Sequence, residues 1–413
     1  MSTLSRQDCA RLDRDDPFAG FRDRFDLPDG ILYLDGNSLG ALPHKVRARL
    51  ARVVDREWGQ DLIRSWNTAD WISLPQRVGG RIARLIGAGE HEVVCADSTS
   101  INVFKLAAGA LALRPGRRTI VTEAGSFPTD VYMLEGLAGL LGDRADLKLV
   151  PRDAVLDAVD DTTAVLLLTH VHYRTGEVWD MAAVTAHVHD AGALVLWDLS
   201  HSTGALDVDL NGARADLATG CGYKYLNGGP GAPAYLFVAD RHQAGFTQPL
   251  SGWMGHARPF DFDDRYQPAA HIGRMTCGTP PVLGLSALDA ALDLFDDVNM
   301  AALRAKSRQL GDLFIDLVEQ RCAGHGLSLA CPRESARRGS QVSFRHAESY
   351  ALVQALIRRG VIGDFRMPDV ARFGLAPLYL RFVDIWDAVD HLAHILSSGE
   401  WDDAALKTKA TVT

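Results

Sequence analysis

The sequence predicts an α/β protein: a large domain with a mostly parallel sheet sandwiched by helices, plus a smaller α+β domain. First, short runs rich in leucine and β-branched residues alternate with helical patterns between residues 92 and 238. Such alternation is typical of a parallel sheet covered on both faces. Second, long helical patterns follow residues 280–281, and beyond residue 327 short strands alternate with helices again. Third, 413 residues, of which 47% are hydrophobic, can bury two cores of unequal size.

Each element is expected from its own segment. In the large domain, strands are expected within 92–97, 117–123, 147–150, 163–171, 193–201, 215–224 and 233–238, and helices within 98–113, 127–141, 151–160 and 181–192. Helices at 282–298 and 299–323 lead to the small domain, with strands within 327–331, 340–345 and 372–377 and helices at 349–360 and 383–398. We therefore expect a large domain at 46–298, a small domain at 299–413, and an N-terminal segment, 1–45, that packs on the small domain.

Charge and composition argue against several classes of function. Lys and Arg number 43 against 52 Asp and Glu, and the net charge of −9 opposes binding to nucleic acid. No apolar run is long enough to cross a membrane, and the polar N-terminus is unlike a signal peptide. Six cysteines without CxxC spacing indicate thiols in a reducing compartment, so a cytoplasmic protein is expected. His187 and His189 would diverge on a helix, so no metal site is predicted.

The run GCGYKYLNGGPGAP, residues 220–233, places a lysine between two expected buried strands. Lysine is rarely buried without a partner, so Lys224 requires a chemical explanation. Ligands of an open parallel sheet bind beyond the carboxyl ends of its strands. Other reactive side chains share that setting: Asp198 ends an expected strand, His201 follows it, and Thr99 and Ser100 open a helix after another strand.

Together these residues fit pyridoxal 5'-phosphate. The cofactor requires a lysine for its Schiff base and a carboxylate that keeps its pyridine nitrogen protonated, and Lys224 and Asp198 match those needs. Thr99 and Ser100 would bind the phosphate at a helix N-terminus, and Phe127 is available to cover the ring. Taken singly, Asp198 and Thr99 also fit helix caps, and Lys224 fits a side chain that reaches the surface. Their joint placement after strands favours the cofactor.

Several segments resemble the kynureninase family, of the fold-type I, class V aminotransferase-like group of pyridoxal phosphate enzymes. The most specific are DGNSLG at 35–40 and YKYLNGGPG at 223–231. The likeness is extended by FPTD at 127–130, WDLSHSTGALDVDL at 197–210, SGWMGH at 251–256, CGTPP at 277–281, RRGSQVSFRH at 337–346 and VIGDFRMPDVARFGLAPLYLRF at 361–382. It implies hydrolysis of L-kynurenine to anthranilate and L-alanine in tryptophan degradation. Whether 3-hydroxykynurenine is also cleaved, to 3-hydroxyanthranilate, stays open.

The resemblance also implies a role for each matching residue. Lys224 would form the Schiff base, Asp198 would pair with the pyridine nitrogen, and Tyr223 is the candidate for proton transfer. Contacts with the cofactor are implied for Thr99, Ser100, Phe127, Asp130, Thr169, Asp198, His201, Tyr223 and Lys224.

Substrate and subunit contacts are implied in the same way. Arg372 matches the arginine that grips the α-carboxylate of the amino-acid substrate, a task suited to its planar fork. Trp66 would line the aryl pocket, with core packing as its alternative. Trp253 and Thr279 match positions that complete the phosphate site of a neighbouring subunit, which implies a homodimer with active sites at the interface.

Related activities remain alternatives. Cysteine desulfurases and selenocysteine lyases resemble a pattern with histidine just before the lysine, where this chain has Tyr223. They use a reactive cysteine on a loop of the small domain, and Cys331 lies in that region, although its surroundings predict a strand end. A class V aminotransferase is also open. From another class, a regulator that binds pyridoxal phosphate without catalysis is the alternative.

Overall fold

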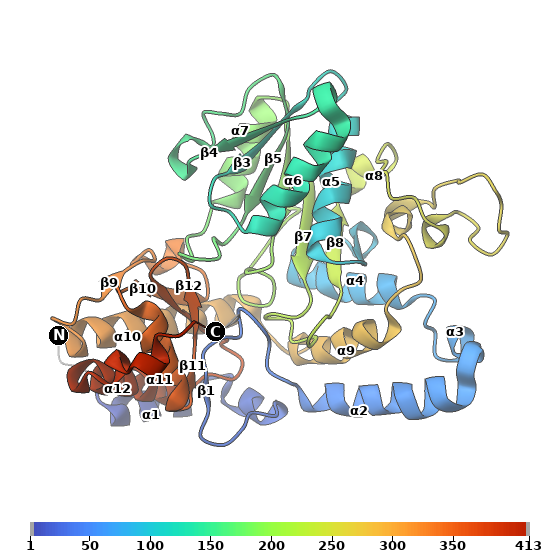
Figure 1. Ribbon diagram of the computed structural model, residues 1–413. Coiled ribbons are helices and arrows are strands. Elements are labelled where there is room, and N and C mark those ends of the chain that lie inside the picture. The colour runs from blue at the N-terminus through green and yellow to red at the C-terminus, as the bar shows by residue number, and fades with distance from the viewer. Residues whose placement is uncertain (1–3, 410–413) are drawn as a thin grey trace.

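The large lobe is a seven-stranded sheet between two layers of helices (Figure 1). The computed structural model describes residues 4–409. In spatial order the strands are β2 (Val93–Cys95), β8 (Ala234–Val238), β7 (Leu217–Cys221), β6 (Leu194–Asp198), β5 (Thr163–Thr169), β3 (Thr119–Glu123) and β4 (Asp146–Val150). Neighbours are parallel from β4 to β7, whereas β8 is antiparallel to both β7 and β2. The prediction of a mostly parallel sheet is confirmed.

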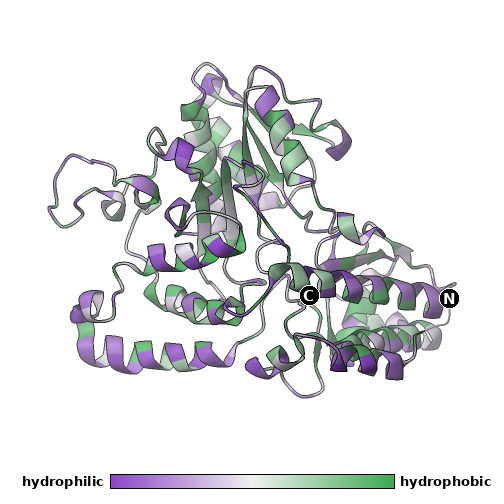
Figure 2. Cartoon of the chain, turned by 180° about the vertical axis from the view of Figure 1, so that it is seen from behind, coloured by the Kyte–Doolittle hydropathy of each residue, from purple (hydrophilic) through white to green (hydrophobic). Residues whose placement is uncertain are grey.

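Alternate residues of the buried strands belong to different cores. In β5, Val165 and Leu167 join one core and Leu166 and Leu168 the other. The first core includes α5 (Thr99–Leu113) and α6 (Pro128–Leu141), and the second includes α4 (Leu74–Leu85), α7 (Met181–Asp190) and α9 (Val282–Leu292). Because both faces are covered, the strands are continuous apolar runs. Figure 2 shows these hydrophobic strands between helices that carry hydrophilic outer surfaces.

The small lobe is an antiparallel sheet packed against three helices. Its order is β12 (Asp364–Arg366), β13 (Val370–Gly374), β10 (Gln341–Arg345) and β9 (Ser328–Leu329). The helices are α10 (Met300–Arg321), α11 (Ser349–Arg358) and α12 (Phe382–Ser398). This is the α+β arrangement that the sequence predicts. Among residues 4–409, no helix has the length and apolar character needed to cross a membrane.

The N-terminal segment contacts both lobes. α1 (Arg6–Arg14) packs on α12, and Arg6 Nε donates to Asp387 Oδ1 at 2.7 Å. β1 (Leu32–Tyr33) pairs in parallel with β11 (Val361–Ile362). α2 (His44–Arg52) then packs on α9 and continues as a π-helix, Val53–Asp61, towards α3 (Ser65–Thr68). Elsewhere in the large lobe, the short helix α8 (Asp240–Gln243) follows β8. The domain limits stay a prediction, and residues 1–3 and 410–413 of the predicted segments lie outside the described residues.

The prediction of a helix at 151–160 is wrong. One turn of 3-10 helix covers Arg152–Ala154, and turns follow. Backbone N–H groups here bond mostly three residues back, as from Ala154 to the Pro151 carbonyl at 3.0 Å. So short a segment is marginal as a helix on its own, and burial of Val155 and Ala158 holds the turns instead.

Candidate active site

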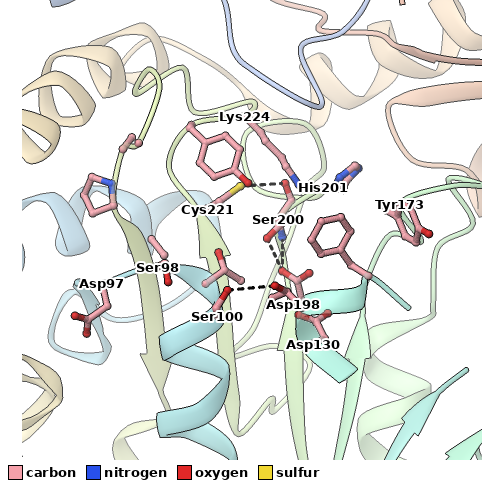
Figure 3. Close-up of a pocket in the computed structure, with 18 of the residues that line it drawn as sticks. Asp97, Ser98, Ser100, Asp130, Tyr173, Asp198, Ser200, His201, Cys221 and Lys224 are labelled. Carbon is pink, nitrogen blue, oxygen red and sulfur yellow. Dashed lines mark hydrogen bonds between the residues drawn. The ribbon is translucent and has the colours of Figure 1, made fainter. Parts of the chain in front are cut away.

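The predicted site residues converge at the carboxyl edge of the large sheet. The strand register places Thr169 beside Asp198 and Cys221 beside Ala234. A cavity of about 520 Å³ lies between this edge and the N-terminus of α5 (Figure 3). Nine predicted residues line it: Thr99, Ser100, Phe127, Asp130, Thr169, Asp198, His201, Tyr223 and Lys224.

Lys224 enters this cavity with aromatic rings around its amine. The residue is 9% exposed, and its Nζ lies 5.7 Å from the Phe127 ring centroid and 5.8 Å from that of Tyr223. Within residues 4–409, no carboxylate or carbonyl hydrogen-bonds to this amine. Burial of an unpaired polar group is costly. The arrangement therefore leaves the amine available to a ligand.

Asp198 is oriented by Ser200. The Ser200 N–H and hydroxyl both donate to Oδ1, at 2.9 and 2.6 Å. Burial raises the pKa of Asp198, while Ser200 and the charge of Lys224 oppose the rise. No described residue donates to Oδ2, which leaves that oxygen as an acceptor for a donor in the cavity.

Asp130, on α6, is a second buried carboxyl in the same cavity. Thr169 Oγ1 donates to its Oδ2 at 3.3 Å, and Oδ1 has no partner among the described residues. Burial, and next the charge of Asp198, raise the pKa of Asp130 well above its usual range. Because two buried like charges repel, Asp130 is the member of the pair that retains its proton.

The N-terminus of α5 faces the cavity with several hydroxyl groups. Ser98 caps the helix by accepting from the Ile101 N–H at 3.4 Å, and Ser100 Oγ lies 3.3 Å from Thr129 Oγ1. Ser98, Thr99, Ser100 and Thr129 all line the cavity. Unpaired N–H groups of a first helical turn, together with hydroxyls, form a site suited to phosphate.

A second buried lysine holds the turn that precedes α5. Lys105, on α5, is 0% exposed, and its Nζ donates to Asp97 Oδ2 and to the Met275 carbonyl, each at 2.6 Å. Asp97 has a φ of +53°, an uncommon conformation for a residue other than glycine. The ion pair therefore fixes the phosphate-facing turn and ties it to the 275–277 segment.

His201 is buried against the small lobe. Its Nδ1 lies 3.0 Å from Oε1 of Gln341, on β10. Burial, and next the charge of Lys224, lower the pKa of His201 well below its usual range. The ring is therefore neutral.

These groups fit pyridoxal phosphate. The cavity offers an amine without a partner, a buried carboxylate with one free oxygen, and a hydroxyl-lined helix N-terminus. Lys224 would hold the aldehyde carbon, Asp198 the ring nitrogen and the α5 turn the phosphate.

Arg372 lies just outside the cavity lining. On β13 and 1% exposed, it donates through Nε to Asp364 Oδ1 at 2.8 Å and through Nη2 to Asp364 Oδ2. Nη2 also donates to Ser38 Oγ at 2.8 Å, and Nη1 to the Tyr173 carbonyl at 2.6 Å. Although burial opposes it, the charges of Arg372 and Arg366 hold the pKa of Asp364 below its usual range. Tyr173 lines the cavity, so a single residue separates Arg372 from it.

Trp253, Thr279 and Trp66 do not line the cavity. The segment between α8 and α9 forms an arm that projects from the large lobe (Figure 1). Trp253 belongs to this segment, is 39% exposed, and contacts Phe260 and Phe262. Thr279 is exposed beside a small cavity of about 90 Å³, lined partly by Asp97. Trp66, half-buried on α3, packs edge-on against Trp71 with ring centroids 6.0 Å apart.

The two histidines of α7 bind different partners. His187 Nε2 lies 3.0 Å from the Leu156 carbonyl and His189 Nε2 lies 2.8 Å from Asp216. In the described part of the chain, no cluster of His, Cys, Asp or Glu is arranged to hold a metal ion.

Sequence reasoning missed part of the cavity lining. The missed residues are Asp97, Ser98, Thr129, Tyr173, Ser200, Cys221, Gly231, Ala232, Pro233, Ala234 and Pro281. Ser200 follows Asp198 by two positions, which is a usable signal because serine in that place readily bonds the carboxylate. Tyr173 has no such signal, since its loop reaches the site only through contacts with the small lobe.

Solved structures share this architecture. A cysteine desulfurase from Thermococcus onnurineus NA1 superposes with a TM-score of 0.76 at 16% identity, over 92% of this chain and 98% of that one. The Escherichia coli cysteine desulfurase CsdA gives 0.77 at 19% identity, with the same coverage. Another neighbour is the enzyme C-DES with glycine linked to its PLP cofactor, at a TM-score of 0.76 and 17% identity, over 90% and 98%. The fold is thus that of the fold-type I, class V-like pyridoxal phosphate enzymes.

Sequence relatives then narrow this class to one family. Kynureninases from Burkholderia mallei strain SAVP1 and Burkholderia pseudomallei strain K96243 are each 52% identical over 414 residues, covering 99% of this chain and 100% of theirs. A Pseudomonas fluorescens kynureninase matches equally. The model of the kynureninase C-terminal domain matches residues 303–392. The chain belongs to the kynureninase family.

The desulfurase alternative is not favoured. The cysteine desulfurases that superpose on this chain are less than 20% identical to it, so they show the fold alone. Cys331 is 7% exposed, and burial raises the pKa of its thiol. A reactive cysteine needs the opposite setting, exposed and with a lowered pKa.

Proposed function

We propose that this protein cleaves the Cβ–Cγ bond of L-kynurenine with water, releasing anthranilate and L-alanine. One observation carries the proposal: the unpaired amine of Lys224 shares a cavity with the free oxygen of Asp198, in a chain of the kynureninase family. Bound there, pyridoxal phosphate supplies an electron sink for negative charge that develops on the substrate carbons.

Lys224 has two tasks in this proposal. Its amine would hold the cofactor and, when free, would take the proton from the substrate α-carbon. The rings of Phe127 and Tyr223 border this amine, which has no competing hydrogen bond from the described residues. Asp198, held by Ser200, keeps its negative charge directed into the cavity.

Tyr223 is the proposed proton donor to the Cβ atom when the bond breaks. Burial, and next the Cys221 thiol, raise the pKa of Tyr223, so the phenol keeps a proton to donate. Its backbone is fixed because the Tyr223 carbonyl accepts from the Gly40 N–H at 2.8 Å. Gly40 itself is required there, since a Cβ would lie 2.3 Å from the Lys224 carbonyl. Tyr223→Phe is expected to leave the cofactor absorbance largely intact and to slow turnover strongly; equal activity would contradict the role.

Arg372 is the proposed partner of the substrate α-carboxylate. Its Nη1 and Nη2 groups already donate to the Tyr173 carbonyl and to Ser38. A carboxylate can replace these neutral acceptors with a stronger, charge-assisted pair. Asp364 stays on the other edge of the guanidinium and keeps the fork oriented.

We also propose a homodimer in which Trp253 and Thr279 complete the partner's phosphate site. The arm around Trp253 exposes Phe260 and Phe262 at 59% and 76%, an unusual apolar surface for a monomer. Near Trp66, Trp58 and Ile63 are exposed as well, which suits an aryl pocket shared between subunits. Sedimentation analysis of the holoenzyme tests this: a monomer at micromolar concentration would contradict it.

A cytoplasmic location is proposed from the thiols. All six cysteines lie within the described residues and are free, as is usual in a reducing compartment.

The activity is tested by mixing purified protein, pyridoxal phosphate and L-kynurenine and recording anthranilate fluorescence. Anthranilate and alanine in equal amounts are expected, and none with Lys224→Ala. Sulfide release from cysteine, or amino transfer that depends on an added keto acid, would replace the proposal with one of its rivals. The same assay with 3-hydroxykynurenine compares the two substrates.

A further inference from the structure

Gln341 lies where the N-terminal segment, the large lobe and the small lobe meet beside the cavity. The residue is on β10 and 1% exposed. Its Nε2 donates to the Tyr173 carbonyl at 3.0 Å, and its Oε1 lies 3.0 Å from His201 Nδ1 and 3.4 Å from the side-chain amide of Asn37. Tyr173 and His201 line the cavity, whereas Gln341 does not. It therefore touches the site only through other residues.

The partners of Gln341 determine which way its amide faces. A carbonyl oxygen can only accept, so Nε2 must face Tyr173. Oε1 then faces His201, and because an amide oxygen also only accepts, the proton must be on Nδ1 of the histidine. The reverse orientation would bring two buried oxygens together at Tyr173 and lose a hydrogen bond.

We propose that Gln341 is a positioning residue that fixes His201 as its Nδ1–H tautomer and so presents an unprotonated Nε2 to the cavity. The His201 ring makes no other hydrogen bond with residues 4–409. Burial, and next the charges of Lys224 and Arg372, lower the pKa of His201, so the ring holds one proton only. Nε2 is then an acceptor for a hydroxyl or ammonium group of the cofactor or substrate; only this last step rests on the proposed function.

The loop that carries the Tyr173 carbonyl is fixed closely around Gln341. Ser343, two residues further along β10, donates through Oγ to the Arg174 carbonyl at 2.7 Å. Gly176 has a φ of +70°, and a Cβ at this position would lie 2.8 Å from the Gln341 Cγ. The amide is therefore held from both sides, and it cannot rotate without breaking contacts between the lobes.

The tautomer is measured directly by NMR on holoenzyme labelled with ¹⁵N-histidine. The His201 signals are assigned by their loss in His201→Gln. Wild type is expected to carry the proton on Nδ1. Gln341→Leu should abolish this preference, because no side-chain oxygen then faces Nδ1. A proton on Nε2 in wild type, or an unchanged spectrum in Gln341→Leu, would overturn the proposal.

A matched control and a binding measurement separate this role from simple packing. Ser343→Ala removes a neighbouring bond between β10 and the same loop without touching His201, and should keep the Nδ1–H form.

Gln341→Leu should weaken cofactor binding by about threefold to tenfold, the effect of one neutral hydrogen bond, and Ser343→Ala by less than about twofold. Equal weakening in both variants would also contradict the proposal. If Gln341→Leu does not fold, the wild-type tautomer decides. A protein without kynurenine cleavage would refute the proposed function while leaving the tautomer measurement valid.

Discussion

Two lysines of the large lobe are buried, and their amines have opposite surroundings. Lys105 donates to the Asp97 carboxylate and to the Met275 carbonyl, and no part of it is exposed. Lys224, 9% exposed, has only the rings of Phe127 and Tyr223 near its amine. The first lysine is held by the protein, whereas the second is left for a ligand.

Lys105 and Lys224 show how a lysine that stabilises the fold differs from one that is left free to react. Lys306, another buried lysine, also follows the structural pattern, because its Nζ lies 2.6 Å from Asp16. Burial alone therefore does not mark the reactive residue. What marks it is burial without a carboxylate partner, inside a cavity, beside an acceptor such as Asp198.

The largest effect is expected from Lys224→Ala. Because the amine both attaches the cofactor and moves the α-proton, kynurenine cleavage should fall by at least about 10³-fold. The free energy of unfolding without cofactor should change by less than about 1 kcal/mol, since no hydrogen bond is lost. Urea unfolding of the apoprotein and the fluorescence assay measure the two quantities. A large loss of stability would show that Lys224 has a hidden structural role.

Lys105→Met should show the reverse pattern, with its main effect on the free energy of unfolding. Removing the cation leaves the partly exposed Asp97 carboxylate and the buried Met275 carbonyl without their partner, which is expected to cost about 2 kcal/mol in the free energy of unfolding. Lys105→Arg keeps the charge and should cost less. Adding Asp97→Asn to Lys105→Met should recover part of the loss, and a double-mutant cycle by urea unfolding checks this. Additive losses would mean that the pair does not interact.

Arg372 combines the two situations, because its guanidinium is paired with a carboxylate and is also proposed to bind the substrate. Asp364→Asn keeps the shape but weakens the hold on the Nε edge of the guanidinium. We expect KM for kynurenine to rise about tenfold, the effect of a loosened charged hydrogen bond, with a smaller change in kcat. Steady-state kinetics test this, with Asp369→Asn, on an exposed ion pair of the same lobe, as control. A fall in kcat at constant KM would contradict the assigned role.

The smallest effect concerns Asp35, beside the Arg372 cluster. Burial, and next the charge of Asp364, raise the pKa of Asp35 to about 7. Since the unfolded chain has a pKa of about 4, folding favours the protonated form. Its contribution to stability is complete below pH ~4 and is lost as pH rises to about 7. Asp35→Asn should remove this pH-dependent loss, as measured by urea unfolding from pH 4 to 8. Parallel pH profiles would rule out a raised pKa.

Much of the fold was predictable because its strands are buried on both faces. Runs such as residues 163–169 and 194–198 have the continuous apolar character that a covered parallel sheet requires, and the strands lie where they were expected. Residues 151–160 were mispredicted because their apolar positions pack as turns rather than along one helical face. In the small lobe, β12 escaped prediction because only pairing with β13 defines so short a strand.

The site was predictable where a residue follows a strand, and not where it depends on contact between lobes. Asp198, Thr99 and Lys224 follow strands of one sheet, so their meeting follows from topology. Lys105 was missed because its ion pair with Asp97 is invisible in an apolar helical pattern. Gln341 was missed because its partners lie far away in the sequence and meet it only in the folded chain.

The most direct test of the central claim is to identify the lysine that bonds the cofactor. Borohydride reduces the linkage between pyridoxal phosphate and its lysine to a stable bond, and peptide mass spectrometry of the reduced holoenzyme locates it. We expect one modified lysine, Lys224, with Lys105 unmodified and no modification in Lys224→Ala. A label on Lys105, or on any lysine other than Lys224, would show that Lys224 is not the residue that bonds the cofactor.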